Sequence, residues 1–235
     1  NSRQVGQFAP NLTAPGTTAL EGDSGTGEPD IGALGSGDVD DAPDELDYLI
    51  ITDSTHKSAL EELEEWHTRT GLRAYTVLTS SIYSNYTGSD NQEKIRNCIA
   101  DFYSNKGISF VLLGGDQAVV PDRDSRGVVG SLVDYNNLPA DYYYACLDGN
   151  WNGDGDSTYG ESEDNPDYYA EVYVGRISSD TASYTENFVS KVINYEQNPP
   201  SSGFCRNHLF TGVELWNTYT GYSDYTYPVS DAEAK

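Results

Sequence analysis

Short apolar runs alternate with amphipathic segments over residues 47–113, and this alternation limits the possible folds more than any other feature of the sequence. The apolar runs span residues 47–52, 73–78 and 108–113 and have the length of buried strands. Two segments with helical periodicity separate them, one ending near Gly71 and the other spanning residues 91–106. The pattern predicts βαβ units in an α/β domain, a mainly parallel sheet with flanking helices. Functional groups are then expected beyond the carboxyl ends of the strands.

The remaining segments extend this pattern on both sides. Residues 1–45 are rich in Gly, Pro, Ser, Thr and Asp and poor in large apolar side chains, which is typical of a linker or pro-segment arm that lies along a surface or blocks a cleft. Residues 46–235 would form the domain, with further elements at 171–176, 181–196 and 208–213. The Tyr-, Thr- and Ser-rich tail closes no unit, so we expect that Lys235 lies within a domain.

An acidic loop separates two runs with strand character, residues 141–147 and 171–174. Carboxylates this dense repel one another unless water or a cation lies between them. If Asn150 is counted as position one, oxygen-bearing side chains stand at positions one, three and five, a glycine at position six and Glu161 at position twelve. This is the spacing of a calcium-binding loop, with asparagine in place of the first aspartate. The candidate Ca²⁺ ligands in this loop are Asp148, Asn150, Asn152, Asp154, Asp156 and Glu161. The alternative is a solvated acidic hairpin loop in which Asn and Asp only form turns.

The charge balance excludes two classes of partner. The chain of 235 residues has 38 Asp and Glu against 13 Lys and Arg, a formal net charge of −25. So acidic a surface repels nucleic acids and anionic membranes. No apolar run approaches the roughly 20 residues that span a bilayer, so no membrane span is expected. Acidity and calcium binding favour an extracellular or secreted protein, and adaptation to a salty medium is an alternative reason for the acidity.

Several fragments, taken in order, resemble the gingipain family of clan CD cysteine peptidases. They are Tyr48-Leu-Ile-Ile with Trp66 and Gly71, Phe110-Val-Leu-Leu-Gly-Gly-Asp116 with Val120-Pro121, Asp141-Tyr-Tyr-Tyr144, Glu171-Val-Tyr-Val-Gly-Arg176 and Tyr195-Glu196. They cover roughly residues 46–214, and their joint order carries the resemblance. It implies a caspase-like α/β fold with Rossmann-like layering, of which residues 46–235 would be the N-terminal portion.

The resemblance also implies roles for individual residues. In the family, the nucleophilic Cys and the general-base His lie in a second half, and this chain contains neither of their motifs. Glu214 corresponds to the carboxylate that orients the catalytic His and fixes its tautomer, although it could also be an ordinary exposed glutamate. Asp167, the carbonyl of Tyr169, and Glu171 correspond to positions where the family holds a calcium. Asp224 lies near the position of the acidic specificity residue of an arginine-selecting relative.

The chain's own thiols are not expected to be nucleophiles. Cys98 lies on the apolar stripe of residues 91–106 and is interpreted as a core residue. Cys146 lies among tyrosines on an expected strand and is interpreted in the same way. Cys205 and His208 are close in sequence, but an extended segment there would lack the strand-end setting of a catalytic pair.

By resemblance, the chain is the N-terminal fragment of a secreted cysteine endopeptidase that cleaves after Lys or Arg and processes its own precursor. A chain that ends at Lys235 fits such a cut, so we expect a C-terminal catalytic fragment that begins after it and carries the Cys and His. This chain alone should be inactive. The alternative hypothesis is a non-catalytic, calcium-binding, peptidase-like surface or binding domain.

Overall fold

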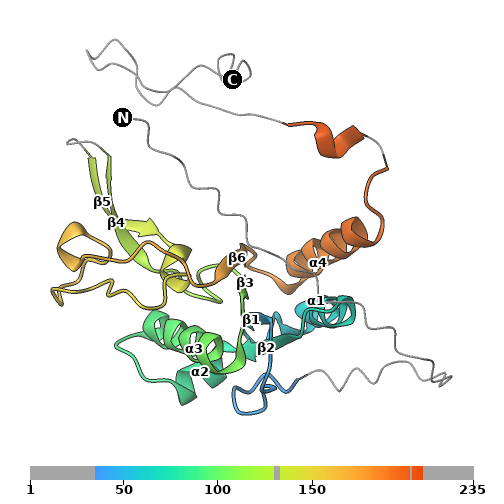
Figure 1. The fold of residues 1–235 in the computed structure, drawn as a ribbon, viewed down its shortest axis with the longest axis horizontal. Coiled ribbons are helices and arrows are strands. Elements are labelled where there is room, and N and C mark those ends of the chain that lie inside the picture. The colour runs from blue at the N-terminus through green and yellow to red at the C-terminus, as the bar shows by residue number, and fades with distance from the viewer. Residues whose placement is uncertain (1–34, 130–132, 202, 209–235) are drawn as a thin grey trace, which may run out of the picture. The chain divides into compact units, whose positions relative to one another are not determined.

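The computed structural model describes residues 35–129, 133–201 and 203–208, which form an α/β domain (Figure 1). The strands are β1 (Tyr48–Thr52), β2 (Ala74–Leu78), β3 (Phe110–Gly114), β4 (Asp124–Val129), β5 (Val133–Pro139) and β6 (Tyr173–Ile177). The helices are α1 (Lys57–Thr70), α2 (Thr79–Asn85), α3 (Asn91–Lys106) and α4 (Ala182–Gln197), with the 3₁₀ helices η1 (Asp141–Tyr144), η2 (Ser162–Asp164) and η3 (Gly203–Arg206). All of them belong to one compact unit that begins at Ala33.

Four strands form a parallel sheet in the order β2-β1-β3-β6. Tyr48 pairs with Ala74 on one side and with Phe110 on the other, and Phe110 pairs with Tyr173, so the four strands begin level with one another. Strands β4 and β5 form a separate antiparallel hairpin. The predicted mainly parallel sheet with flanking helices is confirmed.

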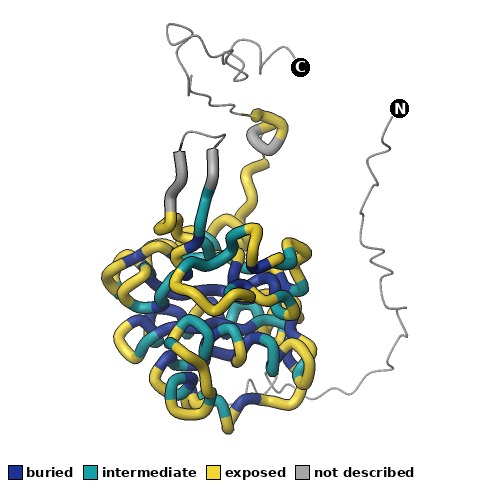
Figure 2. The backbone as a smooth tube through the Cα atoms, turned by 90° about the vertical axis from the view of Figure 1, so that its left-hand side faces the viewer, coloured by how far each residue is buried: buried dark blue, intermediate teal, exposed yellow. Residues whose placement is uncertain are grey.

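Each face of the sheet buries its own apolar core. Ile50, Leu112 and Ile177 pack with the apolar residues of α1 and α4, because alternate side chains of a strand point to the same face. Ile51 and Leu113 belong to a larger core, to which α2 and α3 contribute. The buried backbone segments run through the middle of the described body (Figure 2). Because β3 and β6 are neighbouring parallel strands, their carboxyl ends lie at the same edge of the sheet.

The structure corrects the predicted strand at residues 141–147. Residues Asp141–Tyr144 form the 3₁₀ helix η1, and β6 begins at Tyr173, later than the predicted start at Glu171. Tyr143 and Tyr144 are 3% and 0% exposed, whereas a strand would point such neighbours to opposite faces. The guanidinium groups of Arg96 and Arg123 lie 5.1 and 4.6 Å from the centroid of the Tyr143 ring. Burial of adjacent tyrosines therefore favours the tighter helical turn.

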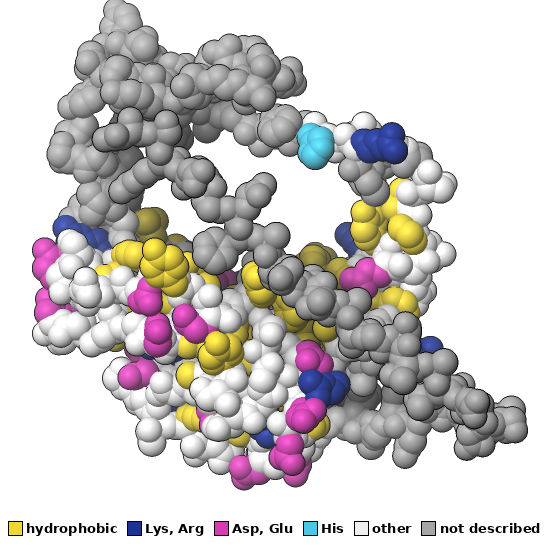
Figure 3. Space-filling model, viewed as in Figure 1, with side chains coloured by type: hydrophobic (Ala, Val, Ile, Leu, Met, Phe, Trp, Pro, Cys, Tyr) yellow, Lys and Arg dark blue, Asp and Glu magenta, His cyan; other side chains and the backbone are white. Residues whose placement is uncertain are grey.

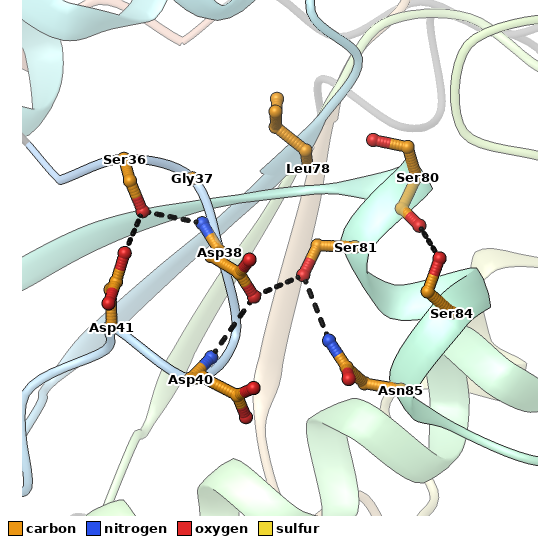
Figure 4. Close-up of a pocket in the computed structure, with 10 residues that line it drawn as sticks. All are labelled: Ser36, Gly37, Asp38, Asp40, Asp41, Leu78, Ser80, Ser81, Ser84 and Asn85. Carbon is orange, nitrogen blue, oxygen red and sulfur yellow. Dashed lines mark hydrogen bonds between the residues drawn. The ribbon is translucent and has the colours of Figure 1, made fainter.

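Residues 35–46 pack against the domain as a strap. The hydroxyl of Tyr75 donates to the Asp38 carbonyl at 2.8 Å. Ser81 Oγ donates to Asp38 Oδ1 at 2.9 Å (Figure 4). At the other end, Lys106 Nζ donates to the Ala42 carbonyl at 2.9 Å, and Leu46 is 1% exposed. The described part of the segment interpreted as a linker or pro-segment thus contributes to the folded body.

Candidate functional site

A cavity of about 350 Å³ lies at the carboxyl ends of β3 and β6, the edge where functional groups are expected. All of the residues that line it except Pro139 have polar or charged side chains, namely Asp116, Gln117, Asp122, Asp141, Arg176 and Ser178. The chain turns into the cavity wall at Gly115, whose φ of +139° favours glycine. A Cβ at this position would lie 2.4 Å from Val119 Cβ. The turn after β3 therefore depends on Gly115.

Arg176 fixes the shape of this cavity. Its Nε and Nη2 atoms each donate to one carboxylate oxygen of Asp141 at 2.7 Å. Its Nη1 atom donates to the carbonyls of Gly115 and Val120 at 2.9 and 2.7 Å. The guanidinium joins β6, η1 and the turn after β3, and so most of its donors serve the protein itself. We assign Arg176 a positioning role in this edge of the sheet.

The acidic loop brings three of its predicted ligands together. Among the described residues, Asp154, Asp156 and Glu161 form the one group of His, Cys, Asp or Glu side chains whose ligand atoms all lie within 4.8 Å of one another. Gly155, at position six of the calcium-type spacing, has a φ of +77°. A left-handed glycine at this position is what the sharp turn of a calcium loop uses.

The two asparagines of the loop are placed differently. Asn150 Oδ1 accepts from the backbone N–H of Asn152 at 3.0 Å and so forms a turn. Asn152 Nδ2 donates to the Asp156 carbonyl at 3.0 Å, which holds the side chain within the loop. Asn152 Oδ1 is buried without a hydrogen-bond partner in the described structure. Buried oxygen acceptors normally have a partner, so this atom is a candidate ligand atom on the same loop as the three carboxylates.

Glu161 has two kinds of charged neighbour. Its partial burial and the nearby Asp156 raise its pKa, and Arg126 opposes this effect. The distance from Arg126 Nη1 to Glu161 Oε2 is 3.1 Å. A guanidinium therefore neutralises part of the carboxylate charge that a calcium ion would otherwise balance.

The other predicted calcium ligands lie outside this group. Asp148 is exposed, and Tyr169 is 82% exposed. Asp167 Oδ1 accepts from the backbone N–H of Tyr169 at 2.9 Å. Glu171 Oε2 accepts from the backbone N–H of Leu147 at 2.6 Å. The carboxylates of Asp167 and Glu171 thus accept hydrogen bonds from nearby backbone N–H groups. Among the described residues, neither belongs to a cluster of three potential metal ligands.

Sequence reasoning missed two residues that shape the loop. Asp164 is 5% exposed and accepts from the backbone N–H groups of Gly153 and Glu161 at 2.6 and 3.1 Å. Its position three residues after Glu161 is the spacing of a capping box, which could have indicated this role. Arg126 lies on β4, far from the loop in sequence, so no local pattern could have indicated it.

The two thiols whose side chains the structure describes are unsuited to nucleophilic attack. Cys98 and Cys146 are both fully buried, and burial raises the pKa of each thiol. Their interpretation as core residues is confirmed. Cys205 lies on η3, so the expected extended segment there is wrong, because residues 203–206 form a 3₁₀ turn. Glu214 and Asp224 lie outside the described residues.

Comparison with known proteins identifies the family. The model of peptidase family C25 matches residues 41–230. The chain belongs to this family. The resemblance to gingipain-like cysteine peptidases is confirmed, and with it membership of a peptidase family.

One curated protein and two solved structures are similar to parts of this chain. Gingipain R2 of Porphyromonas gingivalis (strain ATCC BAA-308 / W83) is 22% identical over 152 residues, which cover 64% of this chain and 17% of gingipain R2. Dimeric latent PorU from Porphyromonas gingivalis has a TM-score of 0.50 at 18% identity and covers 76% of this chain and 18% of its own, which shows a shared fold. The Arg specific cysteine proteinase gingipain R has a TM-score of 0.46 at 19% identity, with 65% and 29% coverage. The chain spans less than a fifth of gingipain R2.

Proposed function

We propose that this chain is the N-terminal part of a cysteine endopeptidase whose nucleophilic Cys and general-base His lie outside residues 1–235. Membership of peptidase family C25 carries this proposal. Two observations support it: Cys98 and Cys146 are buried with raised pKa values, and the chain spans 17% of gingipain R2. Thiolate chemistry needs an accessible thiol beside a base, which neither of these cysteines offers.

The proposal includes cleavage after Lys or Arg, processing of its own precursor and an extracellular location. A net charge of −25 favours the approach of basic substrates, and Asp224 is the proposed acidic contact for the basic side chain. Glu214 is the proposed carboxylate that orients the catalytic His. None of the helices among the described residues is long and apolar enough to cross a membrane.

The test is hydrolysis of fluorogenic peptides by the whole precursor and by this chain alone. Peptides that end in Arg, Lys or Leu before the reporter separate basic specificity from general activity. We expect the precursor to cleave the basic peptides and this chain to cleave none. Glu214→Gln should lower kcat more than KM, whereas Glu186→Gln on exposed α4 is the matched control. Absence of activity in the correctly folded precursor would contradict the proposal and favour a non-catalytic domain.

We also propose that the acidic loop binds Ca²⁺ through Asn152 Oδ1 and the carboxylates of Asp154, Asp156 and Glu161. These atoms fit the ion because calcium takes oxygen ligands, and because the buried Asn152 oxygen lacks another partner in the described structure. The ion would neutralise the loop between η1 and β6. The chain's own Arg126 would hold Glu161 in place beside it. Asp148, Asn150, Asp167, Tyr169 and Glu171 are proposed only as outer contacts of the same region.

A further inference from the structure

The sequence contains two Asn-X-Thr triplets, the acceptor pattern for N-linked glycans. One of them, Asn11-Leu-Thr13, lies outside the described residues. The other, Asn85-Tyr-Thr87, lies at the end of α2, where Asn85 is the last helical residue and Tyr86 has an extended backbone. Asn85 and Thr87 are both exposed. Because glycans are bulky and are carried on surface segments, the fold leaves this second triplet open to modification.

The Asn85 side chain points from α2 toward the strap of residues 35–46 (Figure 4). Its Nδ2 atom donates to Ser81 Oγ at 3.2 Å, and Ser81 Oγ donates to Asp38 Oδ1 at 2.9 Å. Ser81 Oγ also accepts from the backbone N–H of Val39 at 3.0 Å. The nitrogen to which a glycan attaches is thus linked to the strap through one hydroxyl group. A glycosylated amide keeps one N–H, so its hydrogen bond to Ser81 can persist.

Asn85 lines a cavity of about 490 Å³ between α2 and the strap. This volume is within the range of roughly 300 to 1,000 Å³ in which small molecules bind. The exposed polar residues that line it include Asp38, Asp40 and Asp41 of the strap and Ser80 and Ser84 of α2. Figure 3 shows acidic side chains gathered over the strap, at the lower edge of the described body. Ionised carboxylates only accept hydrogen bonds, so the cavity suits a neutral ligand rich in hydroxyl donors.

We propose that Asn85 carries an N-linked glycan whose first sugar lies in this cavity and joins the strap to α2. In the transfer, Asn85 Nδ2 forms a bond to the anomeric carbon of the sugar, and the bond from that carbon to a phosphate oxygen of a lipid-linked glycosyl phosphate breaks. The phosphate leaves with the electron pair, and Nδ2 loses one proton to a base of the transferase. The cell supplies the sugar donor and the transferase, and this chain supplies the acceptor.

The glycan would strengthen the attachment of the strap at this end. Asp38 and Ser36 are exposed, so water competes for the hydrogen bonds that they make. Hydroxyl groups of the first sugar would donate to the strap carboxylates, and one added hydrogen bond should slow local opening about two- to tenfold. The inference rests on the extracellular location in the proposed function, and it requires no peptidase activity.

The test is mass spectrometry of the protein isolated from its natural host. Trypsin cuts after Arg73 and Lys94, so Asn85 lies in the peptide 74–94, apart from the triplet at Asn11. We expect this peptide to carry the added mass of whole sugar residues, which fragmentation assigns to Asn85. Asn85→Gln and Thr87→Ala, expressed in the same host, should each remove the added mass. Asn105→Gln is the matched control, because Asn105 is exposed and belongs to neither triplet, and it should keep the added mass.

Hydrogen exchange of residues 36–46 tests where the glycan lies. We expect exchange about two- to tenfold faster in Asn85→Gln than in the glycosylated chain, with Asn105→Gln unchanged, and circular dichroism checks that each variant keeps its helices. An unmodified peptide 74–94, or a sugar that fragmentation assigns to a serine, would overturn the glycan. Equal exchange in Asn85→Gln and the glycosylated chain would overturn its place in the cavity. Neither result changes the hydrolysis of basic peptides, so the proposed function is tested separately.

Discussion

Arg123 donates two hydrogen bonds of 2.8 Å, one to each carboxylate oxygen of Asp90, while its guanidinium lies 3.9 Å from the ring centroid of Tyr159. Asp90 also accepts from the backbone N–H of Glu93 at 2.8 Å and so caps α3. The Arg123 side chain is 5% exposed. One guanidinium therefore joins the start of α3, the segment before β4 and the acidic loop.

Arg123→Ala should lower the free energy of unfolding by about 3 to 5 kcal/mol, because it leaves the Asp90 carboxylate partly buried without its ion pair. Urea denaturation at neutral pH measures the change. Arg73→Ala is the control, since Arg73 is 49% exposed and its ion pair with Asp47 should contribute at most about 1 kcal/mol. Equal losses in the two variants would contradict a structural role for the buried pair.

The same pair predicts a pH dependence of stability. Burial by itself would raise the pKa of Asp90, but the Arg123 guanidinium and the Glu93 N–H outweigh it and hold the pKa below the usual 3.8. A carboxyl with a lowered folded-state pKa stabilises the fold above its unfolded pKa, and this contribution is lost as the pH falls through the folded value. The stability gap between the unaltered chain and Asp90→Asn should therefore shrink from pH 6 to pH 3. A constant gap in urea titrations would argue against the ion pair.

Gly115→Ala should destabilise the fold by about 1 to 3 kcal/mol. Its φ of +139° is strained for any residue with a Cβ, and that Cβ would lie 2.4 Å from Val119 Cβ. Gly175→Ala is the matched control, because the added Cβ meets open space and a strand favours Ala over Gly by roughly 0.5 to 1 kcal/mol. Thermal unfolding of both variants measures the difference, and we expect a lower melting temperature for Gly115→Ala than for Gly175→Ala. Similar melting temperatures would disprove backbone strain at residue 115.

Calcium should raise the melting temperature of the chain by about 5 °C or more at a concentration a hundred times the dissociation constant. Glu161→Gln or Asp154→Asn should remove most of this rise, because each takes one charged ligand from the cluster. Glu186→Gln is the control, since Glu186 is exposed on α4 and lies outside the acidic loop. A calcium-dependent rise that survives in all three variants would place the ion elsewhere.

The sequence predicts most of the parallel sheet, because buried strands and amphipathic helices leave periodic apolar patterns. The helix over residues 91–106 has the predicted bounds, with Ile95, Cys98 and Phe102 buried on its apolar stripe. Residues Asp141–Tyr144 could not be placed, since runs of tyrosine favour strands locally, whereas contacts with distant parts of the chain bury the rings of Tyr143 and Tyr144 in the core. The calcium-type spacing identified Asp154 and Glu161 as members of one acidic cluster. It could not identify Arg126, which pairs with Glu161 but lies on a strand distant in sequence.

The strap of residues 35–46 bears on how the domain can be produced in isolation. The carbonyl of Gly37 accepts from the Leu78 N–H at 2.9 Å at the edge of β2, and Lys106 Nζ donates to the carbonyls of Ala42 and Pro43. A polypeptide expressed from residue 46 would leave the Lys106 ammonium without these acceptors and would uncover Tyr75. A recombinant form of this domain therefore needs a start before Gly35, upstream of where the strands begin.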